Sequence, residues 1–248
     1  MVRGKSSPTS QRDTISASNK NIIRMKNILI FGVGLIGGSI ALKSKSTKLF
    51  EQVVAVERKG GTLLTPFIKS GMIDRITSNL EYDIANADLI IIATPVAQTH
   101  SILKNIYPHL KPNTAITDVG STKSNVMNDA TKALKEKSIQ FIGSHPIAGS
   151  EKHGPSAAMI NLFEGKNIIV TPPSEGLDFI KEKINLFWSE MGGHITLMTP
   201  QEHDEIFSTI SHLPHILAFS LVNLINDNKK KEILLNFAAS GFRDFSRI

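Results

Sequence analysis

Apolar residues recur along the chain in two spacings, and these predict strands that alternate with helices. Residues 27–31 form an apolar run of strand length, and Ile36 and Ile40 then fall one helical turn apart on the same face. The unbroken apolar run 88–93 is typical of a strand buried on both faces of a parallel sheet. Further strands are expected at residues 52–56, 74–77, 115–119, 140–143, 166–171 and 194–198, and further helices at residues 63–69, 96–106, 124–136 and 177–191.

A glycine-rich turn joins the first expected strand to the first expected helix. Gly32, Gly34 and Gly37 have the spacing G-x-G-x-x-G. The first glycine permits a tight turn, the second lets a pyrophosphate approach the backbone, and the third lets the helix pack closely on the strand. The phosphates would bind at the helix N-terminus, beside Leu35 and Ile36, where N–H groups are unpaired. The turn therefore predicts a dinucleotide-binding unit.

An acid at the end of the next expected strand indicates which dinucleotide would bind. Glu57 lies roughly 20 residues past the last glycine, where a carboxylate binds a ribose hydroxyl and repels a 2′-phosphate. This favours NAD, whereas Arg58 beside it would offset the repulsion and leaves NADP open. Thr94 and Pro95 end the buried strand and form a turn beside the cofactor. The alternative is a structural βαβ unit in which Glu57 is only solvated.

The alternation predicts an α/β fold, a Rossmann-type doubly wound parallel sheet that antiparallel or mixed strands complete. From Pro200 the strand pattern disappears, helical spacing extends to about Asn226, and a second helix is expected at 232–239. This segment is too short to bury much of a core alone, so it must pack on the first domain or on another chain. We expect a dinucleotide-binding domain over residues 26–199 and a small all-helical domain over residues 200–248.

Composition excludes several kinds of protein. The 248 residues contain no cysteine, so disulfides, thiolate metal sites and cysteine nucleophiles are excluded. The net charge of +6 arises near the N-terminus, where the first 26 residues carry six Lys or Arg and one acid. The rest of the chain is near neutral and has no basic helix, so no nucleic-acid partner is expected.

Two segments, residues 1–25 and the apolar stretch 206–225, bear on where the protein is found. Residues 1–25 are basic and Ser-rich, and we expect a disordered extension; a targeting peptide stays open, as does a true start at Met25. Polar residues and Pro214 interrupt the longest apolar stretch, 206–225, so no membrane span is expected. We expect a cytoplasmic location.

Two motifs follow strands whose carboxyl ends face the ligand side of such a sheet. His145 is the best candidate for an acid or base, because the pKa of an unperturbed imidazole lies near neutrality. Gly149 permits a turn that would bring Glu151 back towards it, and Ser121 lies in the motif after the preceding strand. The alternative for His145 is a histidine that the backbone satisfies at a strand end.

Two further clusters lie in the helical segment. Ser211 and His215 flank Pro214, which lacks an N–H for the helix and should therefore kink it. No third ligand of suitable spacing accompanies the histidines, so no metal is expected. Two arginines stand beside aromatic residues in 241–247, the last of them Arg247, and a guanidinium there would pair with a carboxylate; the alternative is a solvated cationic terminus.

Together these segments resemble the prephenate and arogenate dehydrogenases of tyrosine biosynthesis, from about Met25 to the end of the chain. The motifs that carry the resemblance are residues 32–39, 117–123, 143–151, 211–215 and 241–247. The resemblance implies NAD-dependent oxidative decarboxylation of prephenate to 4-hydroxyphenylpyruvate. The alternatives are arogenate as the substrate, or a truncated NAD-binding module without catalysis.

The resemblance also implies roles for single residues. His145 would take the proton of the ring hydroxyl as hydride leaves, and Ser121 would orient His145 or that hydroxyl. Arg247 would bind a substrate carboxylate, and the pocket would be lined by His215, Ser211 and Glu151. Members of this family continue past the arginine motif into a dimeric helical domain, so we expect the domain here to be truncated and a homodimer to need the complete domain.

Overall fold

The computed structural model describes residues 25–57 and 61–246. The expectations for the N-terminal extension, for Arg58 and for Arg247 therefore lie outside the described residues.

The core is one eight-stranded sheet with the strand order β3-β2-β1-β4-β5-β6-β7-β8. Neighbouring strands are parallel except for the β6–β7 pair, which is antiparallel. This confirms the doubly wound sheet with a mixed edge. The strands are β1 (Asn27–Phe31), β2 (Gln52–Val56), β3 (Arg75–Ile76), β4 (Leu89–Ile92), β5 (Ala115–Asp118), β6 (Phe141–Pro146), β7 (Asn167–Thr171) and β8 (His194–Leu197).

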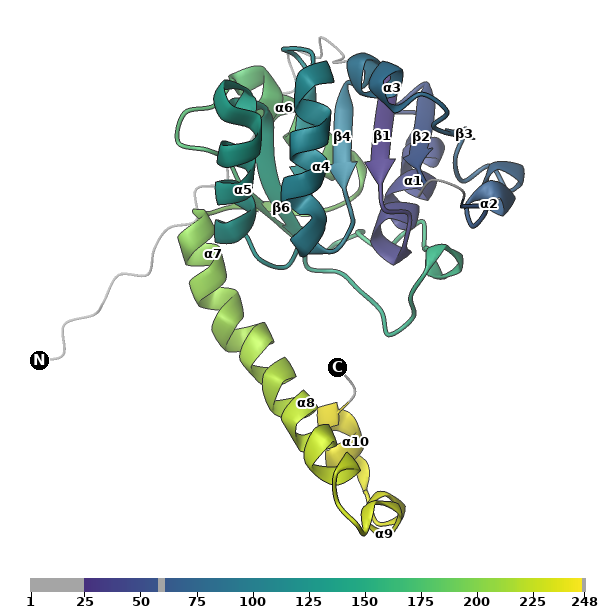
Figure 1. The fold of residues 1–248 in the computed structure, drawn as a ribbon, viewed down its shortest axis with the longest axis vertical. Helices are drawn as coiled ribbons and strands as arrows, with labels where there is room; N and C mark the ends of the chain where they lie inside the picture. Colours follow the sequence, from purple (N-terminus) through teal and green to yellow (C-terminus); the bar gives the residue numbers. More distant parts are fainter. Residues whose placement is uncertain (1–24, 58–60, 247–248) are drawn as a thin grey trace, which may run out of the picture.

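Helices cover both faces of the sheet (Figure 1). Alternate residues of each strand point to opposite sides, so apolar side chains lie on both faces and both must be covered. Ile28 and Ile30 of β1 belong to one core cluster with α1 and α6. Leu29 and Phe31 belong to the other, with α3, α4 and α5. The helices are α1 (Leu35–Thr47), α2 (Thr65–Lys69), α3 (Leu80–Asn86), α4 (Thr99–Ile106), α5 (Ser124–Leu134) and α6 (Asp178–Glu190).

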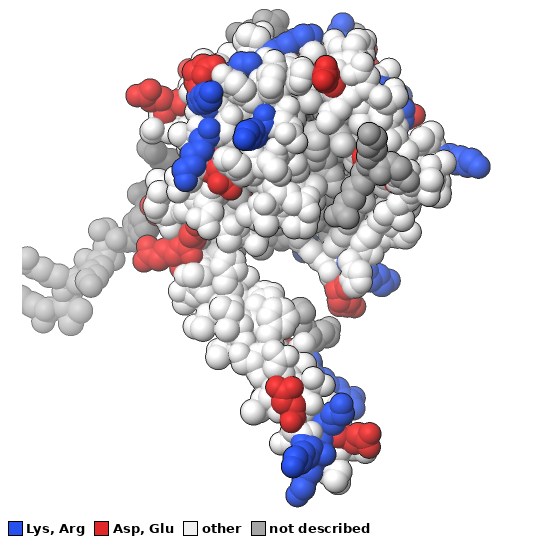
Figure 2. Space-filling model, viewed as in Figure 1, with Lys and Arg blue, Asp and Glu red and all other residues white. Residues whose placement is uncertain are grey.

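The helical segment extends away from the sheet as a rod (Figure 1). It consists of α7 (Pro200–Phe207), a π-helical turn (Ser208–His212) and α8 (Leu213–Asn226), and the short helices α9 (Lys231–Asn236) and α10 (Ser240–Ser246) lie at its far end. Within α8, α9 and α10, Ala218 is the only fully buried residue that the structure describes. Figure 2 shows the rod as largely uncharged on the face in view, with charged residues gathered at its tip.

The rod bears on the expectation that no segment is suited to a membrane. The 27 residues Pro200–Asn226 form one helical stretch, long and apolar enough to cross a bilayer, with a mean hydropathy of 1.3 over its most apolar 18 residues. A single such helix is weak evidence for a membrane span, because helices of soluble proteins also meet this test. Only 6% of those 18 residues are buried, so an apolar surface is left uncovered along this part of the helix.

Four elements differ from the expectations. The helix α10 was not expected, because the last helix was expected at residues 232–239. The short helix α3 was not expected; Asn79 caps it by accepting a hydrogen bond from the N–H of Tyr82. Strand β6 runs to Pro146 because its second half pairs with antiparallel β7. At Pro214 a π-helical turn precedes the proline: the N–H of Leu213 reaches the carbonyl of Ser208. The chain stays helical there, and Nδ1 of His215 donates to the carbonyl of Ser211 at 2.6 Å.

The glycine turn yields a stability prediction. A Cβ on Gly37 would lie 2.0 Å from the carbonyl oxygen of Gly32, whereas a Cβ on Gly34 would meet nothing within 4 Å. Gly37→Ala should therefore lower the free energy of unfolding by about 1–3 kcal/mol, because backbone must move to make room. Gly34→Ala, the matched control, should change it by less than about 0.5 kcal/mol. Chemical denaturation of both variants measures the difference, and equal stabilities would contradict the packing described.

Candidate functional site

The glycine turn lies at the carboxyl end of β1, beside β4, where the strand order reverses. Gly32 has φ +89°, and a Cβ there would lie 2.6 Å from the carbonyl oxygen of Ala93. Gly32 and Gly37 thus hold the turn against β4 and α1, while Gly34 faces open space. A phosphate group fits the surface that a Cβ at Gly34 would otherwise occupy.

The N-terminus of α1 is suited to an anion. The helix begins without a side-chain cap and carries no acid in its first turn. Its first bond runs from the N–H of Gly38 to the carbonyl of Gly34, at 2.9 Å. The N–H groups of Leu35 and Ile36 precede that bond and lack partners within the helix, so they are available to a phosphate.

Two further expected residues lie at this edge of the sheet. The hydroxyl oxygen of Thr94 is buried and has no hydrogen-bond partner among the described residues, which fits a polar ligand beside β4. Pro95 follows it and is exposed. Glu57 directly follows β2, and its Oε1 accepts a hydrogen bond from the N–H of Leu64 at 2.8 Å. One oxygen of this carboxylate therefore already holds the following loop.

His145 lies inside β6, half-buried, at the carboxyl edge of the sheet. Its Nδ1 is 2.8 Å from Nε2 of His203, which comes from α7 and is fully buried. Phe207 packs against both rings, edge-on to His145 at 4.9 Å between centroids and stacked on His203 at 4.6 Å. The two imidazoles and this phenyl ring join the start of the rod to the sheet.

A carboxylate completes the network. Nδ1 of His203 is 2.8 Å from Oδ1 of Asp204. The same carboxylate accepts hydrogen bonds from the backbone N–H of Lys123 at 2.8 Å and of Ser124 at 2.9 Å, at the start of α5. Although burial acts to raise the pKa of Asp204, these hydrogen bonds lower it to about 2.

The two histidines are neutral at pH 7. Burial lowers the pKa of His145 to about 3, and the neighbouring His203, Lys123 and His212 add to the effect, while Asp204 opposes it. Burial likewise lowers the pKa of His203. A neutral imidazole retains a lone pair on one nitrogen, so His145 can act as a base if that nitrogen faces the ligand side.

A buried ion pair shapes the loop that carries Ser121. Lys123 is fully buried, and its ammonium donates to Oδ2 of Asp118 at 2.5 Å. Asp118 also accepts from the N–H of Gly120 at 2.8 Å and of Ser144 at 3.1 Å. Because all donors around this carboxylate are fixed, the loop after β5 is held against β6, next to His145.

The structure does not bring every expected residue to His145. Ser121 and Glu151 are exposed, and His215 lies on α8, where it bonds to Ser211. None of these residues forms a hydrogen bond with His145 within the part of the chain that the structure describes.

Sequence reasoning missed His203 and Asp204. The signal was a polar His-Asp pair that directly follows a Thr199–Glu202 capping box at the start of a helix, and the structure shows this capping box formed. Only the packing of α7 on α5 and β6 gives this pair a partner.

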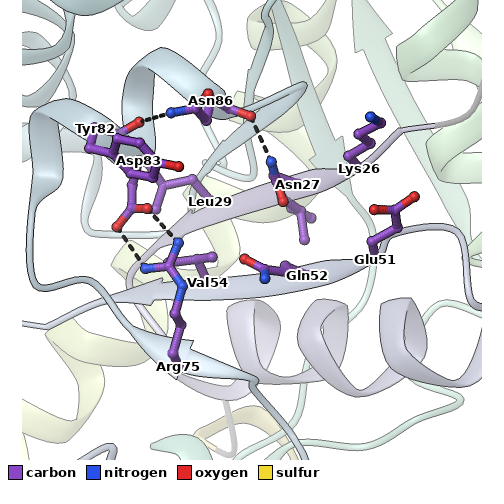
Figure 3. Close-up of a pocket in the computed structure, with 11 residues that line it drawn as sticks. Lys26, Asn27, Leu29, Glu51, Gln52, Val54, Arg75, Tyr82, Asp83 and Asn86 are labelled. Atoms are coloured by element: carbon purple, nitrogen blue, oxygen red, sulfur yellow. Dashed lines mark hydrogen bonds and ion pairs between the residues drawn. The ribbon is translucent and has the colours of Figure 1, made fainter.

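A separate pocket lies at the opposite edge of the sheet (Figure 3), with a volume of about 310 Å³. It is formed by the amino ends of β1 and β2 together with β3 and α3. Its arginine, Arg75, donates to both carboxylate oxygens of Asp83, at 2.9 and 2.5 Å. Because this pocket lies at the amino ends of the strands, it is separate from the glycine turn at the carboxyl end of β1.

Comparison with known proteins gives the family. Residues 40–197 match the family described as "Prephenate dehydrogenase, nucleotide-binding domain", and residues 199–248 match "Prephenate dehydrogenase, dimerization domain". Prephenate dehydrogenase of Bacillus subtilis is 38% identical over 223 residues, which are 89% of this chain and 60% of that protein. The chain thus spans less than two thirds of the length of this relative.

Solved structures agree with this match. The structure of prephenate dehydrogenase from Aquifex aeolicus in complex with hydroxyphenyl propionate and NAD+ is 31% identical, with a TM-score of 0.81 over 90% of this chain and 77% of that chain. The structure of Synechocystis arogenate dehydrogenase is 29% identical, with a TM-score of 0.72 over 89% of this chain and 78% of that chain. In sequence and in fold, this chain belongs to the prephenate dehydrogenase family.

Proposed function

We propose that the chain catalyses the NAD-dependent oxidative decarboxylation of prephenate to 4-hydroxyphenylpyruvate. The observation that carries the proposal is a neutral, half-buried imidazole, His145, at the same sheet edge as an open glycine turn. The Bacillus relative has this activity in its name, and the Aquifex structure contains NAD+ with a hydroxyphenyl acid. Both support the proposal.

The chain's own residues would bind NAD through the glycine turn. Gly34 would let the pyrophosphate approach, the N–H groups of Leu35 and Ile36 would bind it, and Thr94 and Pro95 would border the nicotinamide half. Glu57 at the end of β2 would accept the ribose 2′-hydroxyl with its other oxygen, which favours NAD over NADP. When bound, NAD supplies the hydride acceptor.

His145 would take the proton of the ring hydroxyl as hydride leaves the carbon that bears it. The resulting dienone loses its ring carboxylate as CO2, and the electron pair of that bond makes the ring aromatic. His145 would then return the proton to the phenolate oxygen. Ser121 would orient the hydroxyl, Arg247 would bind a carboxylate, and Glu151, Ser211 and His215 would line the pocket.

Arogenate is the second candidate substrate, because a Synechocystis arogenate dehydrogenase shares the fold. Arogenate differs from prephenate by an amino group in the side chain, so the ring chemistry is the same. Paired assays with both acids decide between them: turnover of arogenate alone would replace prephenate as the proposed substrate.

We propose the domain division at residues 26–199 and 200–248, a homodimer built through the helical part, and a cytoplasmic location. The rod exposes Ile216 by 60%, Phe219 by 58% and Leu224 by 69%. Surfaces of this kind are covered in stable proteins. The match of this segment to a dimerization domain supports a second copy as the cover.

Removal of the proposed base should abolish turnover and spare the cofactor. His145→Asn should lower kcat about 10²- to 10⁴-fold, the usual contribution of a general base, with an unchanged dissociation constant for NAD. NADH formation with prephenate and calorimetry with NAD measure the two. His194→Asn, an exposed histidine on edge strand β8, is the matched control. Unchanged turnover in His145→Asn would refute the assigned role.

A side chain at Gly34 should block the pyrophosphate. Gly34→Ala should keep the stability of the natural chain and weaken NAD binding at least about tenfold, because its Cβ occupies the space left for the ligand. Calorimetric titration with NAD measures the change. Undiminished affinity in this variant would place the cofactor elsewhere.

Charges on the rod should separate the two copies. The double variant Ile216→Asp, Phe219→Asp should halve the mass measured by light scattering, because buried carboxylates in an apolar interface are costly. Asn223→Asp on the same helix is the control. A natural chain that is monomeric in buffer, or that partitions into vesicles, would contradict the homodimer.

A further inference from the structure

We propose that His203 and Asp204 are positioning residues that hold His145 in the tautomer with its proton on Nδ1, so that Nε2 is the free proton acceptor. This inference rests on the proposed role of His145 as the base. Neither residue would touch the substrate; both would act through the ring of His145.

Asp204 determines which nitrogen of His203 carries the proton. Its carboxylate is bound by three donors: the N–H groups of Lys123 and Ser124, and Nδ1 of His203 at 2.8 Å. The two backbone groups can only donate, and they stabilise the charged form of the carboxylate. An ionised carboxylate has no proton to give, so Nδ1 of His203 must carry the proton in that contact.

His203 transmits this constraint. The ring is fully buried and neutral, and a neutral imidazole holds a single proton. With that proton on Nδ1, its Nε2 has a lone pair and can only accept. The contact of 2.8 Å to His145 then requires a donor on the other side.

Nδ1 of His145 is that donor. The neutral ring of His145 has no second proton, so its Nε2 carries the lone pair. The opposite arrangement would need a proton on Asp204, which the two backbone donors disfavour. Asp204, His203 and His145 therefore each have a single protonation state that satisfies these contacts. For His145 that state leaves the lone pair on Nε2, which is what a base requires.

Packing keeps the rings in this arrangement. Phe207 stacks on His203 at an interplanar angle of 25° and meets His145 at 61°. Rotation of either imidazole would require the phenyl ring to move, and Phe207 itself is buried. The hydrogen bonds thus select the tautomer, and the phenyl ring limits the orientations.

The network also stabilises the proton that His145 accepts. When Nε2 takes the hydroxyl proton, His145 becomes a cation whose Nδ1–H donates more strongly to His203. The charge of Asp204 lies one ring away and favours that cation, whereas Lys123 and His212 disfavour it. Asp118 offsets the Lys123 charge through their ion pair. No proton needs to pass along the series.

Histidine-selective nitrogen NMR of the full natural chain tests the inference directly, because it reads the tautomer of each ring without substrate. We expect His145 as the Nδ1–H tautomer and His203 likewise, with signals assigned from His145→Asn and His203→Gln. A wild-type His145 that carries its proton on Nε2 would overturn the inference, whatever any variant does.

Two substitutions at His203 test the consequence. His203→Phe keeps a ring but removes the acceptor, so His145 should shift towards the Nε2–H tautomer and kcat should fall about 10- to 100-fold, with NAD affinity unchanged. His203→Gln places an amide oxygen near the same position and should restore part of the Nδ1–H population and of kcat. A tautomer in His203→Phe that matches the natural chain would overturn the inference.

The control is His100→Phe. His100 faces Asp129 on the surface at 3.6 Å and lies outside the site, so neither the His145 tautomer nor kcat should change. Failure of this inference can be told apart from failure of the proposed function. If His145 carries its proton on Nδ1 but the chain does not oxidise prephenate, the proposed function alone is refuted. If the chain oxidises prephenate while His145 carries its proton on Nε2, the positioning role alone is refuted.

Discussion

The site depends on one carboxylate. Asp204, in the middle of α7, accepts hydrogen bonds from the backbone N–H groups that open α5. These bonds join the helical segment to the sheet and, through His203, to the imidazole on β6. Without them, α7 would keep the packing of Phe207 and the hydrogen bond from the Ser124 hydroxyl to the Pro200 carbonyl, and His145, the proposed base, would lack a fixed orientation.

The cost of this arrangement is a set of buried polar groups. Lys123, His203 and Asp118 are all buried, and each has its partner. Polar groups in such positions destabilise a fold unless every one is satisfied, so the network specifies a single arrangement of the loop after β5. Trp188 and Ser144 extend the same principle below the site, where the indole N–H donates to the serine hydroxyl at 2.9 Å.

In the rod, apolar groups are exposed, whereas at the site polar groups are buried. Its apolar side chains are exposed along α8, which a sheet-packed helix of this composition would bury. The π-helical turn before Pro214 lets the chain stay helical across a residue that cannot donate, and Nδ1 of His215 donates to the carbonyl of Ser211 in that turn. Length and apolarity alone fit a membrane span or an interface between copies, and the match to a dimerization domain favours the interface.

The sequence alone determined the architecture. The sequence located all eight strands, and β4 was the clearest because a strand buried on both faces is a continuous apolar run. The glycine spacing located the turn that a bound pyrophosphate would need. The sequence also singled out His145, because an unperturbed imidazole has a pKa near neutrality and this one follows a strand on the ligand side of the sheet. Each of these signals is local, because it spans only a few consecutive residues.

Only the tertiary structure decided what surrounds His145. His203 and Asp204 lie 58 and 59 positions further along the chain (203 − 145 and 204 − 145), on a helix whose packing no local pattern specifies. The antiparallel β6–β7 pairing likewise drew His145 into a strand. A hydrogen bond between distant segments needs its donor and acceptor placed to within a few tenths of an ångström. That precision is reached only once the sheet, α5 and α7 are packed together.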